Sequence, residues 1–199
     1  MNVSDPEKLG FCHQRLNRIE PRLRTYIDNG DIAGISTLVA RRGQVVNRSL
    51  IGLMSTKTKT PISPDAIFRV YSMTKPIICT ALMTLHEEGR FHLDQPLSQY
   101  LPQFANPEVL ETDGSTERLV PSQREILIKD LFIHTSGLSY TFLADSVAEK
   151  YRASRLLTDA SISLSDTVRL IADHPLLFHP GERWRTIVFP SMCWPTYLK

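Results

Sequence analysis

Ser72 and Lys75 stand three residues apart in the stretch YSMTKPIICTALMTLHEEGR, at the head of a long apolar run. A serine hydroxyl is a weak nucleophile until a neighbouring base accepts its proton, and an unprotonated lysine amine can be that base. Residues i and i+3 lie on the same side of a helix, so the two side chains can meet if this run is helical. The pair therefore offers acyl-transfer chemistry, with Ser72 as the nucleophile and Lys75 as its base.

A second interpretation needs no chemistry. A serine followed three residues later by a lysine arises by chance in many chains, and a serine at the start of a helix commonly caps a backbone N–H group. The spacing alone leaves both interpretations open.

The residues after Ser72 decide how the pair would be held. Apolar side chains cover most of the circumference of a helix over residues 72–88, which predicts that this helix is buried. Free N–H groups and the positive end of the helix dipole would then lie beside Ser72, where they favour an uncharged amine and can stabilise an oxyanion. Pro76 falls in the first turn, where its missing N–H costs little.

Other elements follow from periodicity and turn residues. Residues 9–29 predict a helix that Pro21 kinks or divides, and residues 35–40 with a return strand from residue 45 predict an antiparallel hairpin turning at Arg42 and Gly43. Further along, the sequence predicts short turns with a brief helix over 91–109, a surface loop over 111–123, a short helix over 125–138 ended by Gly137, and helices over 145–157 and 165–173. A hairpin followed by helices indicates an α+β fold.

Composition excludes several classes of protein. The formal net charge is only +2, with 23 basic and 21 acidic residues, and no basic block indicates a nucleic-acid partner. The polar first residues do not resemble a signal peptide, and no apolar run reaches the roughly 18 residues that cross a bilayer, so we expect a cytoplasmic protein without a membrane partner. Three scattered cysteines and six scattered histidines show no metal-ligand spacing, and we expect no metal and no cofactor.

Three longer stretches carry a family resemblance. The text around FRVYSMTK, together with DLFIHTSGLSY and HPLLFHPGERW, resembles the β-lactamase-related serine hydrolases, which include class C β-lactamases, D-alanyl-D-alanine peptidases and esterases. The resemblance spans residues 9–184. It implies a β-lactamase/transpeptidase-like fold in which Ser72 forms the acyl-enzyme and Lys75 helps to deprotonate it.

The resemblance also assigns the remaining motifs. The stretch from His134 to Gly137 is expected to shape a turn near the site, with a base role for His134 as the minor alternative. The stretch from Pro180 to Trp184 is expected to be a structural turn. Substrates would be small carboxylic esters or β-lactam-like amides, while the oligomeric state is not readable from the sequence.

The end of the chain departs from this family. The family carries a catalytic Tyr-Ser pair one residue after the tryptophan turn, but Arg185 is here followed by Thr186 and Ile187, and the late strands of the family sheet have no counterpart. We therefore expect an N-terminal part of the family domain over residues 1–185 and an aberrant tail over residues 186–199. Read one frame over, the tail can encode Tyr-Ser-Phe-Ser-Ile-Asp-Val-Leu-Ala-Tyr-Leu, of which Val-Leu-Ala is forced by the codons. A frameshift near Arg185 is our hypothesis, and nucleotide sequencing of codons 184–199 tests it.

Two hypotheses for function follow. The first is a serine hydrolase whose C-terminally truncated chain, lacking its sheet partners, is poorly stable and weakly active or inactive. The alternative is a non-catalytic fragment or a binding module on the same scaffold.

Overall fold

The computed structural model describes residues 3–114, 116–156, 159 and 161–186. Contacts group the chain into two compact units, Met1–Arg69 and Val70–Lys199, and each is described by itself. Both units combine helices with antiparallel strands, so the α+β prediction is confirmed. The expected tail lies, from residue 187 onward, outside the described residues.

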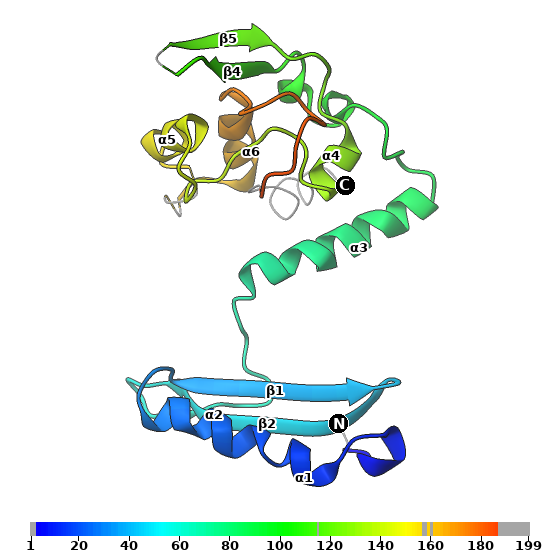
Figure 1. Ribbon diagram of the computed structural model, residues 1–199, viewed down its shortest axis with the longest axis vertical. Helices are drawn as coiled ribbons and strands as arrows, with labels where there is room; N and C mark the ends of the chain where they lie inside the picture. The colour runs from blue at the N-terminus through cyan, green and yellow to red at the C-terminus, as the bar shows by residue number, and fades with distance from the viewer. Residues whose placement is uncertain (1–2, 115, 157–158, 160, 187–199) are drawn as a thin grey trace. The chain divides into compact units, whose positions relative to one another are not determined.

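The first unit is a hairpin with helices along one side (Figure 1). Its elements are the 3-10 turn η1 (Glu7–Leu9), helices α1 (His13–Leu16) and α2 (Ile19–Asp28), and strands β1 (Gly34–Arg41), β2 (Gln44–Ser55) and β3 (Thr60–Pro61). Strand β2 lies between β1 and β3, and both pairings are antiparallel. The buried side chains Leu16, Val46 and Ile51 form a thin core between the helices and β2.

The turn of the hairpin is the predicted one. Arg41 pairs with Gln44, which leaves Arg42 and Gly43 as a two-residue loop, and both have positive φ values of 50° and 72°. Positive φ at both loop positions matches the right-handed twist of the flanking strands. The register shifts once, between Val39 and Ala40.

The predicted helix over residues 9–29 is divided, but not at Pro21. The break falls before Ile19, so Pro21 lies in the first turn of α2. A proline there costs no hydrogen bond, because N–H groups of the first turn have no partner inside the helix.

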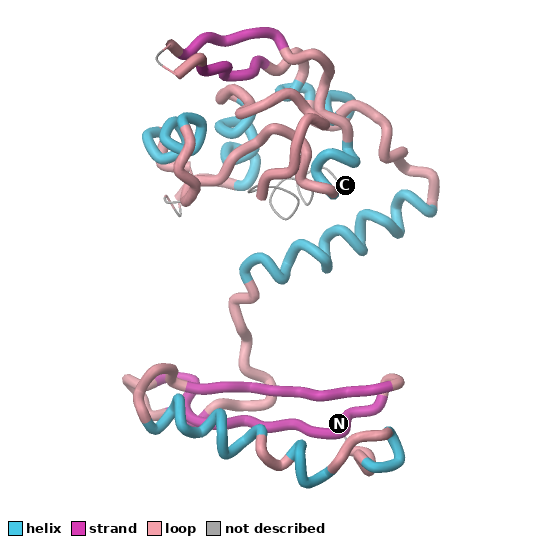
Figure 2. The backbone as a smooth tube through the Cα atoms, in the orientation of Figure 1, coloured by secondary structure: helices cyan, strands magenta, loops and turns pink. Residues whose placement is uncertain are grey.

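The second unit holds most of the buried apolar side chains. Its elements are η2 (Tyr71–Met73), α3 (Thr74–Glu87), η3 (Leu97–Gln99), η4 (Pro102–Phe104), β4 (Glu108–Thr112), β5 (Glu117–Pro121), α4 (Ile128–Phe132), α5 (Ser146–Ala153) and α6 (Leu164–Ala172). Figure 2 shows that these helices are short and joined by long loops, apart from α3. The core gathers from most of these segments, with Leu97, Ile128, Val147, Tyr151 and Val168 fully enclosed.

The surface loop predicted over residues 111–123 is wrong, because most of it belongs to a second hairpin. Strands β4 and β5 pair from Glu108 with Pro121 to Thr112 with Glu117. Asp113 stabilises the turn, since its carboxylate accepts a hydrogen bond from the Thr116 amide at 3.0 Å. The polar residues that suggested a loop lie at the ends of these strands nearest the turn, and most of them are exposed.

Helix α3 is not buried on all sides, which corrects a second prediction. Leu82 is its single buried residue, with Ile78 and Leu85 partly covered by the core of the second unit. The side chain of Ile77, nearer the start of the helix, is 63% exposed. Within this unit the core covers only one side of α3, whereas its sequence is apolar nearly all round.

The helix expected to run to Gly137 ends earlier. Helix α4 stops at Phe132, and His134 and Gly137 then adopt positive φ values of 59° and 84° in a turn. Helices α5 and α6 fall where they were predicted. Asp145 caps α5 by accepting from the Ala148 amide, and Ser163 caps α6 by accepting from the Asp166 amide.

Candidate active site

Ser72 and Lys75 come together at the start of α3. Ser72 lies in η2, Lys75 lies in the first turn of α3, and Lys75 Nζ donates a hydrogen bond to Ser72 Oγ over 3.3 Å. Ser72 is exposed and Lys75 is half-buried, so an acyl compound can reach the hydroxyl from solvent. Tyr71 immediately before the serine has a positive φ of 45°, which is an uncommon conformation for a bulky residue.

The turn after α4 lies within electrostatic range of Lys75. Burial, and to a lesser degree the positive charge of Lys75, lowers the pKa of His134 below its ordinary value. The imidazole is therefore neutral at pH 7 and lies within electrostatic range of the Lys75 amine. A neutral imidazole could accept a proton, but no hydrogen bond in the described structure joins His134 to Ser72.

A second turn packs on the first. The Gly181 amide donates to the Thr135 carbonyl at 2.7 Å, and the Arg185 amide donates to the His134 carbonyl at 2.9 Å. The rings of His134 and Trp184 lie with their centroids 6.0 Å apart. The segments around residues 134–137 and 180–184, separate in sequence, thus form one double turn near Lys75, and the predicted turn after Pro180 is present.

Asp130 anchors the first half of this double turn, and it was not among the candidate residues predicted from the sequence. Its side chain is 1% exposed and accepts from both terminal nitrogens of Arg124 at 2.6 and 2.9 Å, from the Leu127 amide at 2.8 Å and from Thr135 Oγ1 at 2.9 Å. Burial alone would raise the pKa of Asp130, but these hydrogen bonds outweigh burial and lower it. Asp130 is therefore a fully paired buried carboxylate.

Gly137 closes the first turn where no side chain fits. A Cβ atom at this position would collide with the Phe178 carbonyl oxygen, and φ is +84°. We expect Gly137→Ala to lower the free energy of unfolding by about 2–3 kcal/mol, from left-handed strain plus the collision. Urea titration measures this loss. The matched control is Gly89→Ala, where φ is +72° but no atom lies within 4 Å of the Cβ, so only strain of about 1 kcal/mol is expected. Equal losses in both variants would contradict the collision.

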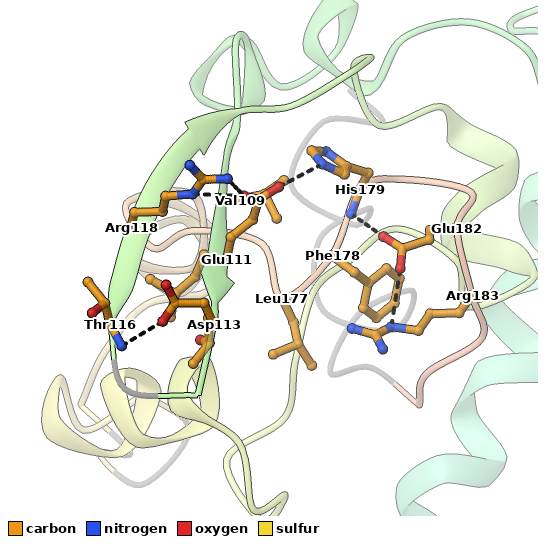
Figure 3. Close-up of a pocket in the computed structure, with 12 residues that line it drawn as sticks. Val109, Glu111, Asp113, Thr116, Arg118, Leu177, Phe178, His179, Glu182 and Arg183 are labelled. Atoms are coloured by element: carbon orange, nitrogen blue, oxygen red, sulfur yellow. Dashed lines mark hydrogen bonds and ion pairs between the residues drawn. The ribbon is translucent and has the colours of Figure 1, made fainter.

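A groove elsewhere on the second unit has a different character. It has a volume of about 620 Å³ and lies between the β4–β5 hairpin and the segment over residues 177–183 (Figure 3). Its polar side chains lie against each other: Arg118 forms an ion pair with Glu111 at 2.6 Å, and His179 Nε2 lies 3.7 Å from a Glu111 carboxylate oxygen. Neither Ser72 nor Lys75 lines it. The groove is therefore separate from the candidate site.

Clusters of metal-binding side chains and long apolar helices are both absent from the described residues. Within that part of the chain, no three His, Cys, Asp or Glu side chains gather closely enough to hold a metal ion. Over the same residues, no helix has the length and apolar character needed to cross a membrane. Cys79, one turn after Lys75 on α3, is a half-buried free thiol, and burial raises its pKa.

Comparison with known proteins identifies the family. The family profile described as Beta-lactamase matches residues 19–185. Esterase EstB from Burkholderia gladioli is 35% identical over 156 residues, covering 77% of this chain and 37% of the esterase. Lovastatin esterase from Penicillium rubens is 31% identical over 176 residues, covering 84% of this chain and 42% of that enzyme.

Solved structures agree with the sequence relatives. The structure of EstCE1, a hydrolase with promiscuous acyltransferase activity, superposes with a TM-score of 0.75 at 30% identity, covering 87% of this chain and 44% of that one. The chain spans about 40% of the length of the curated relatives that it matches. The matched residues include both turns of the double turn as well as the Ser72–Lys75 pair. The resemblance inferred from three short motifs is thereby confirmed, and the chain belongs to the β-lactamase family of hydrolases.

Proposed function

We propose that Ser72 and Lys75 are the catalytic pair of a serine hydrolase that cleaves small carboxylic esters or β-lactam-like amides. The observation that carries this proposal is the 3.3 Å hydrogen bond from Lys75 Nζ to Ser72 Oγ at an exposed helix start. The two relatives named as esterases support the ester class of substrate. No metal and no cofactor take part.

The reaction would proceed in two steps. With Lys75 as the free amine, Ser72 Oγ attacks the carbonyl carbon while its proton passes to Lys75 Nζ, and the ammonium returns that proton to the leaving alcohol or amine. The acyl group is then an ester of Ser72. In the second step, water attacks the acyl carbon as its proton passes to Lys75. The bond from that carbon to Ser72 Oγ then breaks, the ammonium returns the proton to Oγ, and the carboxylic acid leaves. Amide N–H groups at the start of α3, together with the helix dipole, would favour the negative oxygen in both tetrahedral intermediates.

We expect this chain to turn over weakly or not at all. Ser72 is exposed, so water competes with the positioned contacts that would stabilise charge in the transition state. The exposed apolar side chains beside it, Met73 and Ile77, favour the alternative of a non-catalytic or binding role on the same scaffold. The protein is proposed to act in the cytoplasm on a small-molecule partner.

Adduct mapping tests the proposal without requiring turnover. The folded chain is incubated with a fluorophosphonate and, separately, with an activated ester, then digested and analysed by mass spectrometry. We expect one adduct, on the peptide that contains Ser72, and none on the chain unfolded in urea. An adduct confined to other serines, or none on the folded chain, refutes the catalytic assignment and favours the non-catalytic alternative.

A further inference from the structure

Strand β1 has one edge without a backbone partner. The strand order β1-β2-β3 places β1 at the border of its sheet, and helix α2 lies along β2 (Figure 1). The Leu53 amide donates to the Ala33 carbonyl at 2.8 Å, so backbone groups of odd-numbered residues in β1 point to β2 and those of even-numbered residues point outward. Among the described residues, no backbone hydrogen bond reaches the outward groups, which belong to Gly34, Ser36, Leu38 and Ala40.

The opposite border of the same sheet is covered. The Ser4 amide donates to the Val45 carbonyl at 2.7 Å near one end of β2, and the Ile62 amide donates to the Gly52 carbonyl at 3.1 Å near the other. Strand β3 is only two residues long and contains Pro61. Short strands and prolines are devices that prevent a sheet edge from pairing with another chain. Strand β1 has eight residues with neither a proline nor a lysine, so its edge is open to another strand.

The two ends of β1 carry opposite charges. Asp31 lies shortly before the strand and Arg42 directly after it, and both side chains are exposed. Neither side chain forms an ion pair with any residue that the structure describes. Arg41, by contrast, is engaged, because its guanidinium donates to the Leu9 carbonyl at 2.9 Å and lies over the Phe11 ring. Antiparallel pairing of two copies brings Asp31 of each copy toward Arg42 of the other, whereas parallel pairing brings like charges together.

One antiparallel register pairs every outward backbone group of the strand. In this register Thr37 faces its own counterpart across a two-fold axis. Gly34 then lies opposite Ala40, and Ser36 lies opposite Leu38. Because all of these outward residues become hydrogen-bonded pairs, each outward N–H and C=O group of both copies gains a partner. A shift along the strand in either direction leaves some of these groups unpaired.

We propose that the outward edge of β1 binds a second copy of this chain, antiparallel and centred on Thr37. The sheets of the two copies then join into one. Because the opposite border of each sheet is covered, the assembly closes as a dimer and does not extend into a fibre. A single pair of strands is small beside the interfaces of stable dimers, so we expect dimers only at high protein concentration. The inference does not depend on the chemistry proposed for Ser72.

A charge exchange tests the pairing in the full chain, with sedimentation equilibrium measuring the dissociation constant of the dimer. Asp31→Lys and Arg42→Asp each place like charges at both ends of the strand pair, and we expect each to raise the dissociation constant about tenfold. An equal mixture of the two variants restores opposite charges at both ends and should dimerise like the parent. Lys57→Asp changes the net charge as Arg42→Asp does, but at an exposed position outside β1, and should leave the dissociation constant unchanged.

A disulfide tests the register. The native cysteines at positions 12, 79 and 193 are replaced by alanine, and the chain is oxidised with oxidised glutathione. Thr37→Cys should give a covalent dimer, because residues that face each other between hydrogen-bonded pairs are close enough for a disulfide. The matched control is Val39→Cys. Val39 is half-buried like Thr37, but it faces Ile35 of the other copy and should form much less covalent dimer.

Each outcome supports the inference or overturns it. A chain that stays monomeric at every concentration overturns it and leaves the edge to a segment of another protein. A dimer that neither charge variant weakens forms through a different surface. Equal covalent dimer from Thr37→Cys and Val39→Cys overturns the register. Circular dichroism confirms the fold of each variant. If a charge variant does not fold, Ser36→Pro replaces it, since this change removes only an outward amide and should abolish the dimer.

Discussion

Lys75→Met is expected to slow the acylation of Ser72 by an activated ester about a thousandfold, the middle of the range for loss of a general base. Methionine keeps the length and most of the apolar contacts of the lysine stem but cannot accept a proton. The serine hydroxyl would then have to lose its proton to water as it attacks. Intact-mass measurement of the adduct against time gives the rate for the parent and for the variant.

Two further variants define what this loss means. Lys75→Arg keeps a positive charge near Ser72 but cannot give up its proton at neutral pH, so it should be about as slow as the methionine variant. Lys57→Met makes the same substitution at an exposed position in the first unit and should label at the parent rate. A parent-like rate in Lys75→Met would exclude Lys75 as the base, and a parent-like rate in Lys75→Arg would show that its charge is what matters.

The second large effect is expected at Asp130. Asp130→Ala should lower the free energy of unfolding by about 3 kcal/mol, because it leaves the Arg124 guanidinium, the Leu127 amide and the Thr135 hydroxyl without their acceptor. The loss falls at the low end of the range for a broken buried pair, since the Arg124 side chain is 36% exposed and can turn toward water. Urea titration followed by circular dichroism measures it.

The matched control is an exposed ion pair in the same unit. Asp94 pairs with Lys129, with side chains 78% and 44% exposed, so Asp94→Ala should cost less than about 1 kcal/mol. The pH dependence gives a second check. Hydrogen bonds keep the pKa of Asp130 below its unfolded value of about 3.9, so its contribution is full above that pH and is lost as pH falls through the folded pKa. The difference between the parent and Asp130→Asn should shrink in that acid range; a difference constant down to pH 2 would refute this assignment.

Features that could be predicted from the sequence are those that depend on near neighbours in the chain. The first hairpin follows from Arg42 and Gly43 between two apolar runs, and the approach of Lys75 to Ser72 follows from their spacing on one helical turn. The catalytic role of that pair stays a prediction. The family was predictable as well, because several motifs in a fixed order are far more specific than any one of them.

The missed features also depend on near neighbours, but their signals in the sequence are weaker. The β4–β5 hairpin escaped notice because its outward residues are charged, yet Glu111 and Arg118 are cross-strand partners and the Asp113-Gly114 turn was a usable signal. Asp130 escaped notice because the residue types alone do not show that donors from Arg124, Leu127 and Thr135 converge on its carboxylate. The clue was its place beside Lys129 in an otherwise apolar run, because a carboxylate buried there requires several donors.

The exposure of α3 shows a limit of amphipathicity arguments. An apolar circumference predicts burial, but it does not say which segment supplies the cover, and the second unit covers only the side that includes Leu82.

The two hairpins differ in how their strands are completed, and this difference bears on the order of assembly. Strand β1 meets β2 across a two-residue turn. Each residue pair can form next to one already made, so it closes only a short loop and costs little chain entropy. Strand β4, by contrast, also pairs on its other edge with Leu176, which follows α4, α5 and α6 in the chain. The first hairpin can therefore form quickly from contacts between residues that are close in the chain. The second unit also needs a long-range contact, and we expect that slower step to bring residues 177–185 and the double turn into place.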